Sequence, residues 1–232
     1  MSLVVVGTGT EIGKTITCAV LLSRYAGNFK LAYWKPIATG SAEDRDTSVI
    51  ESLCDPEVDI LQESYLFEPP VSPHLAARLA GKKIHPPQVV QALKTYQQEN
   101  AGRALVIEGI GGLLVPLTAD GYLLADLLEE MSLPCLLVAS STLGTINHTL
   151  LTIEAMRSRD LQLVGVVLNG PQNRENRLAI EKFGSVQIVS EIEPLSTLSP
   201  ENVLRAARGF DRKALLESSL KSAGEIQDQS LT

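Results

Sequence analysis

The sequence predicts an α/β domain in which helices cover both faces of a mainly parallel β-sheet. Short apolar runs alternate along the chain with segments that carry helix-end signals, which is typical of repeated strand-helix-strand units. The chain has 232 residues, of which 44% are hydrophobic and 20% charged, with a mean hydropathy of +0.11. This length and composition fit one globular domain with a large core and argue against a disordered polymer.

Six apolar runs are predicted as strands, because each is too short to form a buried helix. They are Leu3 to Val6, Leu31 to Trp34, Ala104 to Ile107, Cys135 to Ala139, Leu163 to Leu168 and, less clearly, Val186 to Val189. Strands of a parallel sheet are buried on both faces, so continuous apolar runs are expected of them. The runs therefore favour a sheet of five or more parallel strands.

Helices are predicted from the signals at their ends. A serine N-cap followed by a first-turn proline marks the start of a helix, and a glycine marks its end. The predicted helices are Gly13 to Tyr25, Ser72 to Gly81, a segment that follows Gly144, and Ser199 to Gly209. Residues 1–210 are expected to form the main domain, and residues 211–232 a loosely packed polar helix with a frayed tail.

The chain is acidic and carries no recognisable targeting signal. It has 20 Lys and Arg against 27 Asp and Glu, a formal charge of −7, which argues against a nucleic-acid or anionic-membrane surface. The first apolar run is too short for a signal peptide or a transmembrane helix. Cys18, Cys54 and Cys135 are an odd number without Cys-x-x-Cys spacing, and the cytoplasm is the expected compartment.

A glycine-rich turn links the first predicted strand to the first predicted helix. It reads Gly7-Thr8-Gly9-Thr10-Glu11-Ile12-Gly13-Lys14-Thr15. Backbone N–H groups of such a turn can surround a phosphate, Lys14 can neutralise β- and γ-phosphate oxygens, and the Thr15 hydroxyl can bind Mg²⁺. From Gly7 to Gly13 the spacing is one residue longer than in the common pattern. Glu11 is expected to face away from the phosphates, toward a ribose hydroxyl, a substrate ammonium or a partner subunit.

Lys35 directly follows a predicted strand, where the ligands of open parallel sheets bind. Pro36 prevents a helix from starting there. Lys35 is expected to neutralise an anionic intermediate near the γ-phosphate, with the Thr39 and Ser41 hydroxyls donating to the same anion. A solvated lysine before a loop is the alternative.

Glu108 follows another predicted strand and precedes Gly109-Ile110-Gly111-Gly112. A carboxylate in this place suits Mg²⁺, and the glycines permit close approach of a phosphate or substrate. Either Asp44 or Asp46 could add a second carboxylate, although a solvated loop explains both residues equally well.

Three further polar residues were considered as ligands. Asn169, which follows the strand ending at Leu168, either reads an adenine edge or belongs to an ordinary Asn-Gly-Pro turn. His74 and His148 lack metal-ligand spacing and are expected to serve helix starts or packing. No transition metal is expected.

Together these motifs resemble those of the dethiobiotin synthetases, ATP-dependent carboxylases of biotin synthesis. The resemblance covers residues 1–205 and implies a single P-loop NTPase domain. The matching motifs are the loop from Gly7 to Thr15, Lys35-Pro36-Ile37-Ala38-Thr39-Gly40, Ser72-Pro73-His74, Glu108-Gly109-Ile110-Gly111-Gly112 and Gly144-Thr145-Ile146-Asn147-His148.

The resemblance implies a reaction and a set of roles. CO₂ would join one amine of 7,8-diaminononanoate as a carbamate, ATP would phosphorylate it, and the second amine would close a cyclic urea. Lys14 and Lys35 would be catalytic, holding the carbamate against the γ-phosphate, and Mg²⁺ would bind at Thr15, Asp46 and Glu108. The implied substrate residues are Thr39, Gly144, Thr145, Ile146 and Asn147. The implied ATP residues are Glu11, Ile12, Gly13, Lys14, Thr15, Ile16, Glu108, Gly109, Ile110, Gly111, Asn169, Gly170, Glu193, Pro194 and Leu195.

The resemblance also implies a homodimer in which the backbone after Gly144 meets the substrate carboxylate across the interface. Two other functions compete with this expectation. A switch ATPase of cell division or partitioning shares the fold, but its hallmark lysine is missing, because Gly9 stands five positions before Lys14. An amidase of the cobyrinic-acid type normally carries a glutaminase domain, and the segment after the ATPase fold is too short for one.

Overall fold

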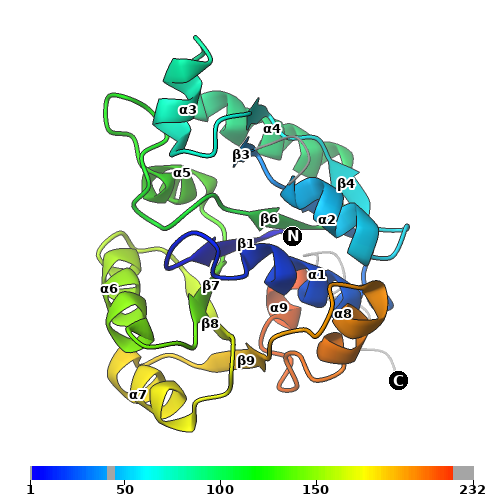
Figure 1. Ribbon diagram of the computed structural model, residues 1–232. Coiled ribbons are helices and arrows are strands. Elements are labelled where there is room, and N and C mark those ends of the chain that lie inside the picture. Colours follow the sequence, from blue (N-terminus) through cyan, green and yellow to red (C-terminus); the bar gives the residue numbers. More distant parts are fainter. Residues whose placement is uncertain (1, 41–44, 222–232) are drawn as a thin grey trace, which may run out of the picture.

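The computed structural model describes residues 2–40 and 45–221 and contains a seven-stranded, all-parallel sheet in that part of the chain (Figure 1). The strand order is β4-β2-β6-β1-β7-β8-β9. The strands are β1 (Ser2–Gly7), β2 (Leu31–Trp34), β4 (Asp59–Leu61), β6 (Ala104–Glu108), β7 (Cys135–Ser140), β8 (Leu163–Asn169) and β9 (Ile188–Ile192). A separate parallel pair is formed by β3 (Ile37–Thr39) and β5 (Tyr65–Phe67).

Helices pack on both faces of the sheet, as the sequence predicts (Figure 1). One face is covered by α1 (Lys14–Tyr25), α2 (Asp46–Leu53), α8 (Pro200–Ala207) and α9 (Glu217–Leu220). The other face is covered by α3 (Pro73–Leu79), α4 (Pro86–Glu99), α5 (Leu124–Met131), α6 (Thr145–Arg157) and α7 (Arg174–Gly184). The sheet therefore separates two hydrophobic cores, and the side chains of β1, β2, β6 and β7 alternate between them.

The strands β2, β6 and β1 lie side by side and end at the same edge of the sheet. In register, Trp34 pairs with Ile107, and Val5 pairs with Glu108. Because all three strands run in the same direction, the residues that follow them meet at one edge. This edge receives the glycine-rich loop, Lys35 and Glu108, and it is the place where a ligand site is expected.

Five of the six predicted strands and the four predicted helices are confirmed. The sixth strand begins two residues later than predicted, because Ser185 ends α7 in a left-handed conformation and Val186 and Gln187 complete the turn. The strands β3, β4 and β5 were not predicted, and each has only three residues. No described helix is long and apolar enough to cross a membrane.

The described residues after position 210 are anchored to the α1 core rather than loosely packed, so that prediction is wrong. Leu216 and Leu220 are fully buried there. Asp211 is buried as well, and its carboxylate accepts hydrogen bonds from the Tyr25 hydroxyl at 2.6 Å and from the N–H groups of Leu215 and Leu216. The predicted frayed tail, residues 222–232, lies outside the described residues.

Candidate active site

The loop between β1 and α1 has the tight backbone that a phosphate-binding turn requires. Gly13 has φ of 90°, and a Cβ at this position would lie 1.5 Å from the Asn169 side-chain nitrogen. A Cβ on Gly7 would meet the Ile12 side chain at 2.6 Å. The positive φ of Gly13 favours glycine there, and at Gly7 an added Cβ would require the Ile12 side chain to move, so the loop wraps closely over the start of α1. Asn169 donates to the Ile12 carbonyl at 3.0 Å and thereby ties the loop to the end of β8.

Lys14 is buried and folded over its own loop. Its Nζ donates to the Gly9 carbonyl at 2.8 Å. Burial, followed by repulsion from the nearby Lys35, lowers the pKa of Lys14 below its usual range. A lysine in this position gains stability from an incoming anion, which restores a favourable partner for its charge. This behaviour suits a residue that receives phosphate oxygens.

Lys35 lies between the two carboxylates of Asp46 and Glu108. Its Nζ donates to Glu108 Oε1 at 2.7 Å and forms an ion pair with Asp46 Oδ2. The Thr15 hydroxyl contacts both acids, with Oγ1 2.6 Å from Asp46 Oδ1 and 3.0 Å from Glu108 Oε1. The structure thus brings together four of the predicted site residues, one from each of α1, α2, the end of β2 and the end of β6.

The charges of this cluster stabilise one another. Burial alone would lower the pKa of Lys35, but Glu108 and Asp46 outweigh it and raise that pKa above its usual range. Burial would likewise raise the pKa of Asp46, but Lys35 and the Thr15 hydroxyl outweigh it and lower that pKa. Lys35 is therefore a cation and Asp46 an anion near neutral pH. The lysine acts as the counter-ion of two acids at the mouth of the phosphate loop.

Thr15, Asp46 and Glu108 together fit a magnesium ion. All three supply hard oxygen donors, which Mg²⁺ prefers. The Thr15 hydroxyl can donate its single hydrogen to only one of the two carboxylates at a time. One of its two close oxygen–oxygen contacts, to Asp46 or to Glu108, therefore has no hydrogen bond. A cation shared by the three oxygens would satisfy both contacts. No cluster of three or more His, Cys, Asp or Glu occurs in residues 2–40 and 45–221, so the remaining ligands would come from phosphate and water.

The loop after Glu108 packs against the phosphate loop. A Cβ on Gly112 would lie 3.4 Å from the backbone of both Thr8 and Gly9. Gly109 donates its N–H to the Val5 carbonyl, and a Cβ there would be 3.4 Å from the same oxygen. Gly111 has φ of 61°. These glycines let two loops approach each other beside the cluster, whereas the predicted approach of a phosphate or substrate stays a prediction.

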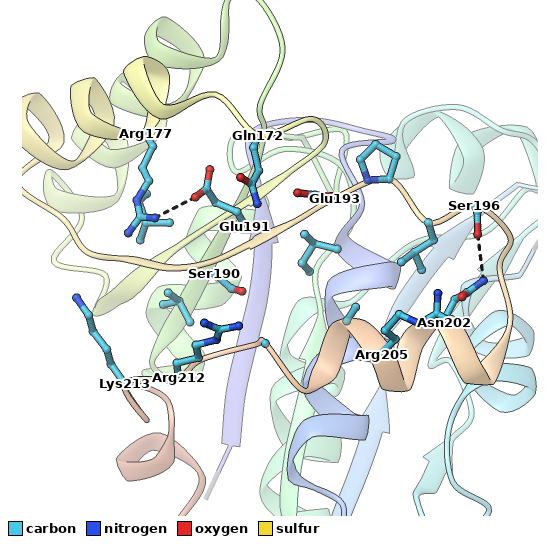
Figure 2. A pocket seen from close by; sticks show the side chains of 17 residues that line it. Gln172, Arg177, Ser190, Glu191, Glu193, Ser196, Asn202, Arg205, Arg212 and Lys213 are labelled. Carbon is cyan, nitrogen blue, oxygen red and sulfur yellow. Dashed lines mark hydrogen bonds and ion pairs between the residues drawn. The ribbon is translucent and has the colours of Figure 1, made fainter.

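Part of the predicted ATP site borders a groove at the β9 edge of the sheet, but Asn169 and Gly170 do not line it. The groove has a volume of about 630 Å³, and Figure 2 shows that Gln172, Glu193 and Asn202 line it. Pro194 and Leu195 line it as well, but no phosphate-loop residue does. Its wall also carries the ion pair between Arg177 and Glu191 (Figure 2). The groove is therefore separate from the cluster of Thr15, Lys35, Asp46 and Glu108.

The start of α6 is placed for a different ligand. Gly144 is the N-cap with φ of 93°, and the Thr145 hydroxyl donates to the Ser140 carbonyl. The Thr145 N–H donates to the Thr142 carbonyl at 3.1 Å, so a carboxylate at this helix start would be bound by the N–H groups that follow it. Ile146 is half-buried and Asn147 exposed. Leu143, just before the helix, is fully exposed.

The other predicted residues take varied positions. Glu11 is exposed with φ of 57°, Thr39 ends β3, and His148 is exposed on α6. His74 lies in the first turn of α3, and its buried Nδ1 has no hydrogen-bond partner among the described residues. Asp44 and Ser41 lie outside the described residues.

Two functional residues were missed by sequence reasoning. The Tyr33 hydroxyl donates to Glu108 Oε2 at 2.9 Å, and strand alternation could have found it, because Tyr33 and Lys35 share a face. Glu63 binds Arg45 and Thr47, the two neighbours of Asp46, at 2.5 and 2.6 Å. No local pattern marks Glu63, which reaches this place only through the fold.

Comparisons with known proteins place this geometry in a family. The family model described as "AAA domain" matches residues 1–202. The ATP-dependent dethiobiotin synthetase of Paramagnetospirillum magneticum is 41% identical over 86% of this chain and 91% of its own. That of Brucella ovis is 40% identical over 90% of this chain and 93% of its own.

Solved structures show the same fold at low sequence identity. A ParA family ATPase from Chlorobium tepidum has a TM-score of 0.55 and 14% identity, covering 95% of this chain and 97% of its own. The MinD cell division protein of Aquifex aeolicus has a TM-score of 0.52 and 12% identity, covering 90% and 95%. These likenesses concern the fold alone, whereas the two sequence relatives match this chain at about 40% identity over most of its length and of their own. The chain belongs to the ATP-dependent dethiobiotin synthetase family.

Proposed function

We propose that the cluster at the end of β2 and β6 carries out the ATP-dependent formation of dethiobiotin from 7,8-diaminononanoate and CO₂. The observation that carries the proposal is Lys35, a buried cation held by two acids directly beside Lys14 and Thr15 of the phosphate loop. An anion placed between Lys14 and Lys35 would lie next to the γ-phosphate. This is the arrangement that transfer of a phosphoryl group to a carbamate requires.

The reaction proceeds in three steps. One amine attacks CO₂, a C–N bond forms, and the amine loses a proton to leave a carbamate. A carbamate oxygen then attacks the γ-phosphorus, the bond from phosphorus to the bridging oxygen breaks, and ADP leaves. Finally the second amine attacks the carbonyl carbon, the bond to the phosphate oxygen breaks, and phosphate and a proton are released with the cyclic urea.

The chain's own residues have distinct tasks in these steps. Lys35 neutralises the carbamate oxygen that attacks, and Lys14 moves from the Gly9 carbonyl to the phosphate oxygens. Thr39, which ends β3, donates to the substrate. Mg²⁺ held by Thr15, Asp46 and Glu108 would neutralise charge that develops on the phosphates. With the metal held there, Asp46 and Glu108 would no longer depend on Lys35 alone for a positive partner.

The nucleotide extends from the phosphate loop toward the β9 edge. Glu11, Ile12, Gly13, Lys14, Thr15 and Ile16 bind its phosphates and ribose, together with Glu108, Gly109, Ile110 and Gly111. Asn169 and Gly170 at the end of β8, with Glu193, Pro194 and Leu195 after β9, hold the base. Support comes from the contact between Asn169 and the Ile12 carbonyl and from the groove at Glu193.

The enzyme is proposed to act as a homodimer in the cytoplasm. Asn147 and Leu151 are exposed one turn apart on α6, and Leu143, just before the helix, is exposed as well; we treat the three as one stripe at the start of α6. Covering the stripe with a second subunit would bury Leu143 and Leu151 and bring a partner's substrate close to the first turn of α6. There the backbone of Gly144, Thr145, Ile146 and Asn147 would bind the substrate carboxylate. Residues 1–210 are proposed to form the synthetase domain and to supply all the residues of the proposed site.

The test is a reconstituted reaction with each component omitted in turn. The pure protein is incubated with MgATP, bicarbonate and 7,8-diaminononanoate, and dethiobiotin is followed by mass spectrometry beside phosphate release. We expect one phosphate per dethiobiotin, and neither product when the diamine is omitted. Phosphate release that is indifferent to the diamine would refute the proposal and favour a switch ATPase.

A further inference from the structure

Glu108 is contacted on both of its oxygens, but from opposite sides. Thr15 and Lys35 lie at Oε1, on the side of the phosphate loop. Tyr33 lies at Oε2, where its hydroxyl donates at 2.9 Å from within the core. The carboxylate therefore has one oxygen that faces ligands and one that is held by the protein.

The strand β2 explains why Tyr33 reaches this place. Side chains alternate along a strand, so Tyr33 and Lys35 point to the α1 face, whereas Trp34 points to the opposite core. Tyr33 is fully buried, and a buried phenol must find an acceptor for its hydroxyl. The neighbouring strand β6 supplies that acceptor at its last residue, Glu108.

Tyr33 and Lys35 contact Glu108 in different ways. The Tyr33 phenol is neutral, fully buried and donates to Oε2, whereas Lys35 is a cation and donates to Oε1. A neutral donor can stay in place when a metal ion arrives, whereas the Lys35 cation at Oε1 competes with the ion.

We propose that Tyr33 is a positioning residue that fixes the Glu108 carboxylate with Oε1 turned toward the Mg²⁺-nucleotide. The inference rests on the magnesium site proposed above. Partners that orient a metal ligand from behind commonly change metal affinity by 10- to 100-fold when they are removed. Without the hydroxyl, the carboxylate can rotate, and Oε2 becomes free to join Oε1 on Lys35.

The chain offers a matched control for this hydroxyl. Tyr25 is also buried on the α1 face, and its hydroxyl also donates to a buried carboxylate, that of Asp211, at 2.6 Å. Asp211 does not belong to the site. Tyr25→Phe therefore removes the same kind of hydrogen bond as Tyr33→Phe but leaves the cluster intact.

The experiment measures the Mg²⁺ concentration that half-saturates binding of a non-hydrolysable ATP analogue, by titration calorimetry. The proteins are wild type, Tyr33→Phe, Tyr25→Phe, Glu108→Gln and the double variant Tyr33→Phe/Glu108→Gln. Binding in EDTA and thermal melting show that each is folded, and titrations are made well below the lowest melting point. Mn²⁺ bound in place of Mg²⁺ is counted by electron paramagnetic resonance as an independent readout.

We expect Tyr33→Phe to raise the half-saturating Mg²⁺ concentration by about tenfold or more, and Tyr25→Phe to leave it unchanged. The double variant should match Glu108→Gln, because Tyr33 acts only through that carboxylate. If Tyr33→Phe lowers only the melting temperature and needs the same half-saturating Mg²⁺ concentration as Tyr25→Phe, the inference is overturned but the proposed metal site is not. If Glu108→Gln itself shifts nothing, the proposed metal site fails, and the inference with it.

Discussion

Replacing Lys35 by methionine tests whether this lysine is the counter-ion of the cluster. The change removes the charge but keeps most of the stem, so packing is largely conserved. It leaves Asp46 and Glu108 facing each other without the cation that now contacts both. Removing one partner of a buried ion pair commonly costs about 3–5 kcal/mol.

The structure decides where in this range the variant falls. The Glu108 side chain is 1% exposed, but that of Asp46 is 34% exposed, so water partly compensates Asp46 for the loss of the cation. We therefore expect a loss near the lower end, about 3 kcal/mol. For a chain of this size each kcal/mol lowers the melting temperature by about 2–4 °C, so the shift should be about 6–12 °C.

Thermal melting with and without Mg²⁺ and a non-hydrolysable ATP analogue is the assay. The ion replaces the missing positive charge, so the ligand-induced rise in melting temperature should be larger in Lys35→Met than in the wild type. Dethiobiotin formation should fall by about 10²- to 10³-fold, since an electrostatic contact to the transferred anion is lost. A variant that melts like the wild type, with the same ligand-induced rise, would refute the counter-ion role.

Three further outcomes are expected. Gly13→Ala should abolish nucleotide binding in a fluorescence titration, because the new Cβ collides with Asn169 in a positive-φ backbone; wild-type affinity would contradict the described loop. The pKa of Asp46 is lower in the folded protein than in the unfolded chain, where it is about 3.9. The Asp46 carboxylate therefore stabilises the fold at pH values above the unfolded pKa, and this stabilisation is lost as the pH falls through the folded pKa. In Asp46→Asn, the urea concentration at half-unfolding should therefore fall less as the pH is lowered than in the wild type. The same fall in both proteins would speak against the ion pair. Leu143→Glu with Leu151→Glu should yield monomers in sedimentation velocity, whereas intact dimers would place the interface elsewhere.

Features of the site that depend on consecutive residues, or on the ends of parallel strands, could be predicted from the sequence. The loop from Gly7 to Thr15 could be recognised because its function depends on consecutive backbone groups, and the comparisons confirm a P-loop family. Lys35 and Glu108 could be brought together because parallel strands end at one edge of the sheet. The dethiobiotin synthetase resemblance is confirmed by relatives about 40% identical over most of the chain.

Contacts between distant segments could not be predicted in the same way. Glu63 fixes the neighbours of Asp46 from the connection between β4 and β5, two three-residue strands that carry no periodic signal. The burial of Leu216 and Leu220 depends on the packing of α9 against β1 and α1, which a polar local composition conceals. The roles proposed for single residues in binding the substrate and the nucleotide base stay predictions, because such binding depends on several distant segments that meet only in the folded protein.

In the proposed mechanism a carbamate oxygen, and not water, attacks the γ-phosphate between Lys14 and Lys35. The most direct measurement starts the reaction with ¹⁸O-labelled bicarbonate and determines the isotope content of the released phosphate by mass spectrometry at early times. We expect one ¹⁸O in each phosphate that accompanies a dethiobiotin, because the bond between the carbonyl carbon and the phosphate oxygen breaks in the last step and the labelled oxygen stays on phosphorus. Unlabelled phosphate formed together with dethiobiotin would contradict it.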